Sequence, residues 1–349
     1  MTTETPVAAL GPFVEKQLVT LQNDIRLLVV AGSGSENIPK PVGLAVETCV
    51  SNDIYTVAHA FGLLGLALHE AHHRGMDCQV TPSVIEHFAR LANNDLPPKV
   101  AIIGPVNVGL NIALLAGAYG MEPILCHRPG KGKDPDRGIT DDLGAAVAVV
   151  DIIFITVNSQ DLIDVDLASR IEPGRILVNI ARGQAISDKA WKLLANRSTE
   201  ISIATDVWPN ESKAQEEFTH GIAQLIVNHR IIGTPHSGAR WEECNLMIVQ
   251  EVAHKIARYL GNTYLTKPKN KLTVDNYPKL AERIGRLGSR QELIAERIAL
   301  QRVRCIRTNM FHLAGQVLDG KDIRWPILSA DIELQNSPEQ LWANALNQL

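Results

Sequence analysis

Apolar runs of strand length alternate with segments of helical spacing through the middle of the chain. Residues 99–127 form the first such unit, in which an apolar strand, a glycine turn, a helix and a second apolar strand follow one another. The later segments that read as buried strands are 151–157, 175–181, 201–207 and 231–236. Helical segments follow at 164–171, 187–196 and 240–260. This alternation predicts an α/β fold built on a doubly wound parallel sheet.

The flanking segments predict a smaller domain and a helical tail. Before the sheet region, strand candidates lie at 25–30 and 43–50, and helical candidates at 13–22, 54–73 and 82–93. A polar, proline-containing linker at 93–99 marks a domain boundary. After the sheet region, a capping box at 289–292 with an apolar stripe predicts a long helix, and a serine–proline pair at 337–338 predicts another. We expect domains at 1–98 and 99–262, then a return segment and helical extension at 263–349.

The composition is that of a globular chain without a strong charge bias. Hydrophobic residues make up 45% and charged residues 21% of the 349 residues, and the formal net charge is −4. Neither nucleic acid nor a membrane is therefore an expected partner. The five cysteines show no CxxC spacing, and residues 1–30 lack a basic start followed by a long apolar run. We expect a cytoplasmic location.

A possible metal motif lies at the end of the helix predicted at 54–73. His69, Glu70 and His73 form H-E-x-x-H, which on a helix can hold zinc with the glutamate as general base. The alternative is a polar, solvated helix end before Arg74 and Gly75. Because a catalytic zinc needs a third protein ligand and no downstream segment indicates one, we expect no metal.

The turn within 99–127 has the spacing of a dinucleotide-binding loop. Gly104 and Gly109 occupy the outer positions of G-x-G-x-x-G, and Val106 occupies the middle one. In such a turn the N–H groups at the helix start face a pyrophosphate, and glycines permit the turn and the close approach. With Val106 and Pro105 departing from the pattern, both a nucleotide site and a plain buried βαβ unit remain open.

Three motifs that follow in order resemble those of the D-isomer-specific 2-hydroxyacid dehydrogenase family: RILVNIARG (175–183), TDVWPNE (205–211) and GTPHSGARWEE (233–243). The similarity extends upstream to LLVVAGSGSENI (27–38) and NDIYTVAHAFGLLGLAL (52–68). It implies a Rossmann-type cofactor domain and a smaller flavodoxin-like substrate domain, which is shortened here. It also implies hydride transfer between a nicotinamide cofactor and a small 2-oxo or 2-hydroxy acid.

The residue types in these motifs fit that chemistry. Reduction of a 2-oxo acid needs a cation to hold the carboxylate and polarise the carbonyl, and a proton donor whose pKa lies near neutrality. Arg182 can supply the first and His236 the second. Glu211 stands where the family keeps the carboxylate that fixes the histidine tautomer and raises the imidazole pKa.

The resemblance implies further contacts. Asp206 corresponds to the residue that contacts the nicotinamide carboxamide. The expected donors to the substrate carboxylate are Ser33, Gly34 and Ser35. The expected cofactor-binding residues are Gly104, Val106, Asn107, Val108, Gly109, His127, Arg128, Val157, Ile180, Ala181, Asp206, His236 and Gly238.

One position decides the expected cofactor. Enzymes that prefer NAD place an acidic residue at the end of the second strand, where it binds the ribose hydroxyls and repels a 2′-phosphate. This chain has His127 and Arg128 there, followed by Lys131 and Lys133. The positive charge and the missing acid favour NADP over NAD, with a solvated basic loop as the alternative.

Two classes of function remain open. The first is an oxidoreductase that acts on a small carboxylate or on a phosphonate analogue, and the second is a cofactor-sensing protein similar to the corepressors built on this scaffold. The presence of Arg182, Glu211 and His236 favours the enzyme. We expect a homodimer, in which the C-terminal stripe covers the shortened domain or reaches a second subunit.

Overall fold

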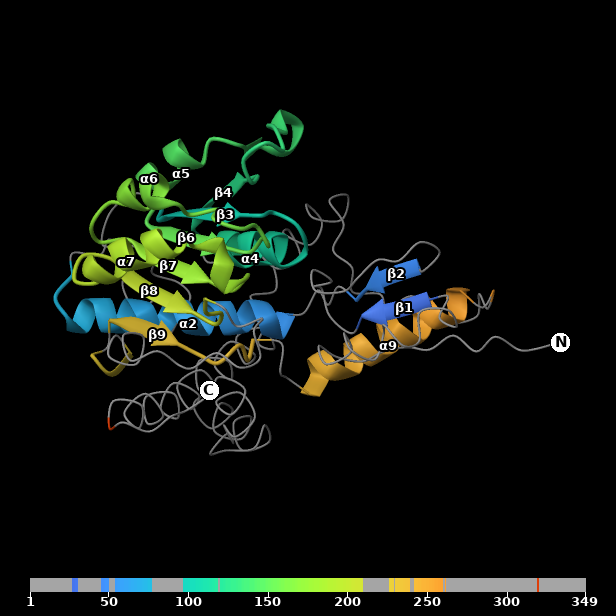
Figure 1. Ribbon diagram of the computed structural model, residues 1–349. Coiled ribbons are helices and arrows are strands. Elements are labelled where there is room, and N and C mark those ends of the chain that lie inside the picture. The colour runs from blue at the N-terminus through green and yellow to red at the C-terminus, as the bar shows by residue number, and fades with distance from the viewer. Residues whose placement is uncertain are drawn as a thin grey trace. The chain divides into compact units, whose positions relative to one another are not determined.

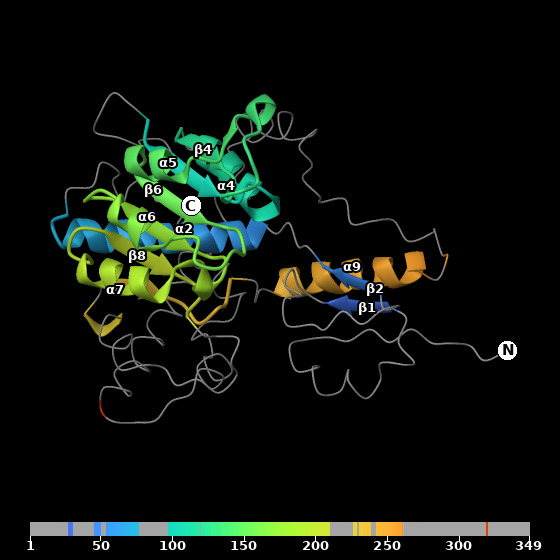
Figure 2. The same ribbon diagram turned by 45° about the horizontal axis from the view of Figure 1, so that its top comes forward.

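The computed structural model describes residues 27–30, 45–49, 54–76, 97–118, 120–209, 226–228, 230–238, 242–259, 261 and 319 (Figures 1 and 2). The chain divides into two compact units. The larger unit covers Ile54–Gly238 and Thr273–Leu349, and the smaller one covers Met1–Asp53 and Ala239–Leu272. The helices predicted at 13–22, 82–93 and after 289 lie outside the described residues.

The larger unit is built on a seven-stranded parallel sheet. Its strands are β3 (Lys99–Ile103), β4 (Glu122–Cys126), β5 (Ile139–Thr140), β6 (Ile152–Ile155), β7 (Ile176–Asn179), β8 (Ser202–Thr205) and β9 (Ile231–Gly233). They lie in the order β5-β4-β3-β6-β7-β8-β9, so the winding direction reverses between β3 and β6. The predicted doubly wound Rossmann-type sheet is confirmed.

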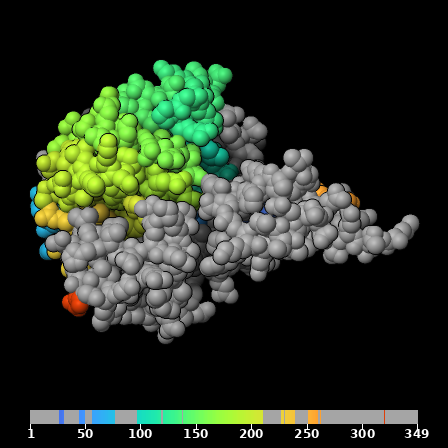
Figure 3. All heavy atoms as spheres, viewed as in Figure 1, coloured from blue at the N-terminus to red at the C-terminus, as the bar shows by residue number. Residues whose placement is uncertain are grey.

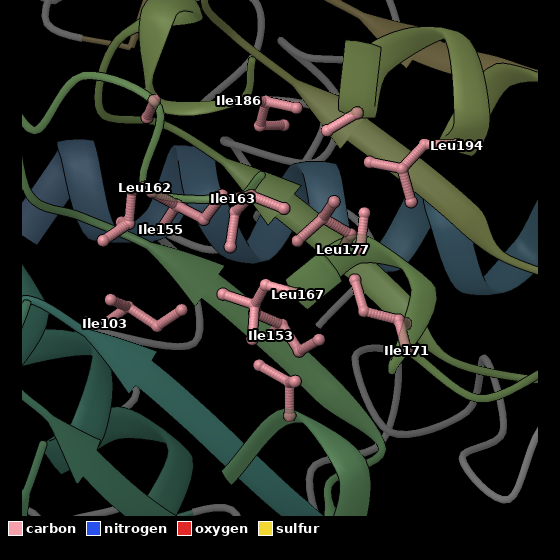
Figure 4. Close-up of a cluster of buried hydrophobic side chains, with 14 of the residues drawn as sticks. Ile103, Ile153, Ile155, Leu162, Ile163, Leu167, Ile171, Leu177, Ile186 and Leu194 are labelled. Carbon is pink, nitrogen blue, oxygen red and sulfur yellow. The ribbon is translucent and has the colours of Figure 1, made fainter. Parts of the chain in front are cut away.

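Helices cover both faces of the sheet because both faces are apolar. Within β3 and β6, Ala101 and Ile153 join one buried cluster, and Val100 and Ile152 join the other. Helices α5 (Leu143–Val149), α6 (Val165–Ser169) and α7 (Asp188–Asn196) contribute to the first cluster (Figure 4). Helices α2 (Ile54–His73) and α4 (Asn107–Ala118) contribute to the second. Strand residues that alternate between two apolar layers explain the continuous apolar runs in the sequence.

Local capping explains where the first-face helices begin. The Asp142, Asp164 and Ser187 side chains accept hydrogen bonds from the backbone three residues ahead, at 2.9, 2.8 and 3.2 Å. Each satisfies an N–H group that lacks an intrahelical partner. Helix α5 and the two-residue strand β5 are elements that the sequence analysis did not predict.

Helix α2 belongs to the larger unit, although the sequence analysis placed it in a domain that ends at residue 98. The centroid of the Phe61 ring lies 5.7 Å from the centroid of the Phe154 ring on β6. The Ser202 hydroxyl on β8 donates to the Ala67 carbonyl at 3.0 Å. The division between units therefore falls at residues 53/54, because the apolar length of α2 is buried against the sheet.

The smaller unit contains a parallel pair of strands, β1 (Leu27–Val30) and β2 (Ala45–Thr48), and helix α9 (Glu242–Tyr259). Leu27, Val29, Cys49 and Val252 form a buried cluster between the strands and the helix. On β2, Glu47 pairs with Lys255 at 3.0 Å and Arg258 at 3.2 Å. Because α9 packs here, the second division falls at 238/239, not at the predicted residue 262.

None of the helices that the structure describes combines the length and apolar character needed to cross a membrane.

The two glycines of α4 give a matched test of the packing around the turn after β3. A β-carbon on Gly109 would collide with the Gly104 carbonyl oxygen and lie 2.7 Å from Thr156 Oγ1, whereas one on Gly117 would meet nothing within 4 Å. We predict that Gly109→Ala lowers the free energy of unfolding by about 1–3 kcal/mol, because it overpacks a backbone contact. Gly117→Ala is expected to leave it unchanged or raise it by up to about 1 kcal/mol.

Urea denaturation of the two variants measures this difference. Equal stability of the two variants would contradict the close packing of α4 on the turn.

Candidate active site

The carboxyl ends of neighbouring strands bring the predicted polar groups to one edge of the sheet. Arg182 follows β7, Asp206 directly follows β8, and His236 follows β9. The three strands are adjacent and parallel, so their carboxyl ends share an edge. Gly104 after β3 and Val157 after β6 lie at the same edge, where the winding direction reverses. In open α/β sheets this is the place where ligands bind.

The turn after β3 is packed so closely that only glycine fits at its outer positions. Gly104 has a φ of +101°, and a β-carbon there would lie 2.9 Å from the backbone nitrogen of Val157. The Thr156 hydroxyl contacts the carbonyl oxygens of Ile103 at 3.0 Å and Gly104 at 2.8 Å. These contacts hold the turn against the start of the loop after β6.

The middle position of the turn tolerates a side chain. Val106 is 51% exposed, and its backbone does not adopt a positive φ. Helix α4 begins at Asn107, so the first N–H groups of the helix, including those of Val108 and Gly109, have no acceptor within the helix. A glycine turn that a β-carbon would fill, followed by a helix N-terminus, fits a pyrophosphate.

Asp206 is the most densely hydrogen-bonded acidic group of this edge. Its Oδ1 accepts from the Thr234 hydroxyl at 2.5 Å and from the Ser237 N–H at 2.8 Å. Its Oδ2 accepts from the Gly238 N–H at 2.8 Å. His59 Nε2 on α2 lies 3.3 Å from Oδ1. The carboxylate thus connects β8, the turn after β9 and α2.

These contacts keep Asp206 ionised although it is buried. Burial raises the pKa of the Asp206 carboxyl, but the charge and hydrogen bond of His59, the charge of His236 and the Thr234 hydroxyl together lower it well below its usual range. The resulting stabilisation is fully present above the unfolded value of about 3.9 and is lost as the pH falls through the folded value.

His236 is held in a backbone conformation that few side chains adopt. Its φ is +49°, in the left-handed region, and its N–H contacts the carbonyl oxygens of Asp206 at 2.7 Å and Thr234 at 3.0 Å. Such a conformation is unfavourable for a residue other than glycine and persists only when neighbouring contacts enforce it. The main chain and side chain of Asp206 supply those contacts, and the imidazole is half-buried.

The Arg182 guanidinium is positioned by the tight turn after β7. Its Nη1 donates to the Ala181 carbonyl at 2.8 Å, and the Asn179 side chain donates to the Arg182 carbonyl at 3.0 Å. A β-carbon on Gly183 would collide with the Trp208 carbonyl, so the turn lies directly against the chain after β8. The half-buried Arg182 therefore emerges from a closely packed backbone.

His127 and Arg128 follow β4, at the end of the second strand as predicted. His127 Nδ1 lies 2.9 Å from the Gly132 carbonyl, which ties the loop to itself. Arg128 and Lys131 are exposed. In the space-filling view, the segment from β4 to α5 lies on the surface of the larger unit (Figure 3).

The other predicted positions lie either at this edge or outside the described residues. Ile180 and Ala181 follow β7, and Gly238 lies against Asp206. The predicted partner of the histidine, Glu211, lies outside the described residues. So do the predicted substrate donors Ser33, Gly34 and Ser35.

The H-E-x-x-H sequence lies at the end of α2. His69 and His73 are exposed, whereas Glu70 is buried. Among the residues that the structure describes, no group of three or more His, Cys, Asp or Glu is placed to hold a metal ion. That the protein holds no zinc remains a prediction.

His59 and Thr234 are not among the site residues predicted from the sequence. His59 is fully buried, and its Nε2 lies 3.2 Å from Thr234 Oγ1 as well as near Asp206. The available signal was a single histidine within an otherwise apolar helical stretch, 57–68. Buried polar side chains are nearly always hydrogen-bonded, so such a residue indicates a partner elsewhere in the fold.

Comparison with known proteins agrees with this geometry. Residues 84–238 match the family model described as D-isomer specific 2-hydroxyacid dehydrogenase, NAD binding domain. The chain is 24% identical over 285 residues to D-3-phosphoglycerate dehydrogenase 2, chloroplastic, from Arabidopsis thaliana, covering 75% of this chain and 44% of the relative. The chain spans about half the length of the curated relatives it matches.

Solved structures share the fold. D-lactate dehydrogenase from Aquifex aeolicus, complexed with NAD and lactic acid, gives a TM-score of 0.56 at 18% identity and covers 74% of this chain and 84% of that chain. An acyclic imino acid reductase in complex with NADPH and D-Arg gives a TM-score of 0.53 at 18% identity. The match covers 76% of this chain and 84% of that chain.

The glycine turn at the reversal of the sheet and the family match describe the same segment. Residues 84–238, which contain this turn, are similar to the NAD binding domain of the D-isomer specific 2-hydroxyacid dehydrogenase family.

Proposed function

We propose that the protein is a nicotinamide-dependent oxidoreductase that transfers a hydride between its cofactor and a small 2-oxo or 2-hydroxy acid. The observation that carries this proposal is the position of Arg182 and His236. They follow β7 and β9 on either side of β8, at the sheet edge that also contains the glycine turn. A cation and a proton donor next to a nucleotide cradle are the groups that carbonyl reduction needs.

The cofactor would lie across the carboxyl ends of β3 and β6, and when bound it supplies or accepts the hydride. Gly104 and Gly109 would admit the pyrophosphate to the start of α4, where the N–H groups of Asn107 and Val108 are available. Val157, Ile180, Ala181 and Gly238 would complete the cradle.

The chain's own groups would handle the substrate and the proton. Arg182 would bind the carboxylate and polarise the carbonyl through its guanidinium. His236 would donate the proton to the carbonyl oxygen as the hydride arrives. By family resemblance, Glu211 would orient the imidazole, and Ser33, Gly34 and Ser35 would receive the substrate carboxylate.

Asp206 has a second role in this proposal, beyond the one that the family resemblance implies. The family assigns the carboxamide contact to this position. Here its carboxylate also accepts hydrogen bonds from Ser237 and Gly238. We therefore propose that Asp206 serves both the cofactor and the turn that carries His236.

We further propose that NADPH is preferred over NADH. The loop after β4 carries an exposed Arg128 and no acidic residue at the ribose position. An arginine can form charge-assisted hydrogen bonds with a 2′-phosphate. The fold itself is compatible with both cofactors, since related structures hold NAD in one case and NADPH in another.

The described residues add no observation in favour of a phosphonate substrate or a cofactor-sensing protein without turnover. A cytoplasmic location and a homodimer likewise remain predictions.

Removal of the catalytic groups tests the reaction. We predict that Arg182→Ala and His236→Ala each lower kcat/KM by about 100-fold or more, because each removes a group that acts in the transition state. The measurement follows nicotinamide absorbance with NADPH and NADH against a panel of 2-oxo acids. Arg170→Ala, in an exposed ion pair just after α6, and His72→Ala, on the exposed end of α2, serve as matched controls. Unchanged turnover after loss of Arg182 or His236 would contradict the assignment.

The proposed role of Glu211 predicts a shift in the pH dependence. A carboxylate partner favours the protonated imidazole, so its loss makes the proton leave at lower pH. For Glu211→Gln, the decline of the reduction rate with rising pH is therefore expected to begin at lower pH than in the wild type. An unshifted profile would exclude Glu211 as the partner of His236.

Cofactor preference has its own test. A charge-assisted hydrogen bond is worth about 1.5–3 kcal/mol, which corresponds to a tenfold to hundredfold effect. We expect Arg128→Ala to weaken NADPH binding by that factor and to leave NADH binding unchanged, and His127→Asp to favour NADH. Lys192→Ala, which removes one exposed positive charge from α7, is the control. Equal dissociation constants of the wild type for the two cofactors would refute the preference.

A further inference from the structure

His59 is a polar residue in the apolar layer between α2 and the sheet. It is fully buried, and the neighbouring residues Val57, Phe61, Leu63 and Leu64 belong to the apolar cluster on this face. Its Nε2 reaches two atoms of the active-site edge, Asp206 Oδ1 at 3.3 Å and Thr234 Oγ1 at 3.2 Å. An imidazole in such a place needs a specific partner to offset its desolvation.

The neighbouring groups determine which His59 nitrogen carries a proton. The Thr234 hydroxyl has one hydrogen, which it donates to Asp206 Oδ1 at 2.5 Å. Toward His59, the Thr234 oxygen can therefore only accept, and so can the ionised carboxylate. Nε2 must be the donor to both. Nδ1 is buried without a partner among the described residues, so the side chain is anchored through Nε2 alone.

The groups that His59 contacts are those that hold the turn of His236. Asp206 accepts from the N–H groups of Ser237 and Gly238, on the C-terminal side of His236. A β-carbon on Gly238 would lie 2.8 Å from Asp206 Oδ2 and 3.4 Å from His59 Cδ2, so the turn lies directly against both side chains. His236 itself keeps its left-handed backbone through its N–H contact with the Asp206 carbonyl.

We propose that His59 is a positioning residue for the proton donor. Its Nε2–H donates to Asp206 and Thr234, which orients the Asp206 carboxylate toward the Ser237 and Gly238 amides and thereby sets the direction of the His236 imidazole. This inference rests on the proposed function for its catalytic consequence, but the contacts are independent of the reaction. His59 does not itself touch the reacting atoms.

Two amide substitutions separate the hydrogen bond from the other properties of the ring. Glutamine places an N–H group near the position of Nε2, whereas asparagine places one nearer that of Nδ1, and both are neutral. His59→Gln is expected to retain kcat within about threefold, because the donor is kept. His59→Asn is expected to lower kcat by about 10- to 100-fold with little change in cofactor KM, because misplacement of a reacting group costs rate more than binding. His72→Asn, on the exposed end of the same helix, controls for the helix propensity of asparagine.

A second readout does not need turnover. Backbone amide NMR signals of Ser237 and Gly238 report their hydrogen bonds to the Asp206 carboxylate, and the ring signals of His236 can be assigned from their loss in His236→Ala. These signals are expected to move in His59→Asn and to stay near their wild-type positions in His59→Gln. If the wild type reduces no 2-oxo acid, the proposed function fails while the role of His59 is still decided by these signals.

Several results would overturn the proposal. Wild-type kcat and unmoved signals in His59→Asn would show that the hydrogen bond positions nothing, and equal losses in both variants would show that the ring itself is needed, not its Nε2 donor. If His59→Asn does not fold, His59→Leu removes the Nε2 donor and keeps a side chain of similar size that suits the apolar layer between α2 and the sheet. It is expected to show the same signal movements and loss of kcat, and wild-type values for it would reject the proposal.

Discussion

The candidate active-site edge depends on one buried carboxylate. Asp206 directly follows β8, and its two oxygens accept hydrogen bonds from the turn after β9 while His59 approaches from α2. A buried carboxylate is costly unless hydrogen-bond donors or opposite charges surround it, and here the donors come from two separate elements, α2 and the turn after β9. The carboxylate that His59, His236 and Thr234 keep ionised also accepts hydrogen bonds from the turn in which His236 has a strained backbone conformation. Stability and catalytic geometry therefore rest on the same group.

The glycine turn at this edge depends on close backbone packing. Gly104 and Gly109 are placed where β-carbons would collide with Val157 and with the turn itself, so the turn is formed by contacts between main chains. Val106 is exposed at the intermediate position, where a side chain causes no such collision. Val106 in place of the usual middle glycine is therefore compatible with the turn that precedes α4. Hydrogen bonds to a buried carboxylate therefore hold the part of the edge around Asp206, whereas close backbone packing holds the glycine turn.

Much of this arrangement could be predicted from the sequence. The strand at 152–155 is buried on both sides, and its continuous apolar run identifies it. Arg182 and His236 each follow a strand that the apolar pattern predicts, so the sequence also predicts that both lie at the same edge of the sheet. Other features depend on contacts between distant residues: α2 joins the sheet through packing with Phe154, and His59 meets Asp206 across 147 positions of the chain. The two-residue strand β5 is too short to leave a pattern.

A crystal structure of Asp206→Asn shows whether the carboxylate holds the turn of His236. Asparagine has nearly the same shape but only one acceptor oxygen, so its amide nitrogen would face the N–H of either Ser237 or Gly238. In a crystal structure of this variant, we expect the turn at 234–238 to rearrange and His236 to leave the left-handed region, while β8 and β9 keep their positions. A variant in which His236 retains a φ near +49° and both amides retain their bonds to residue 206 would contradict this expectation.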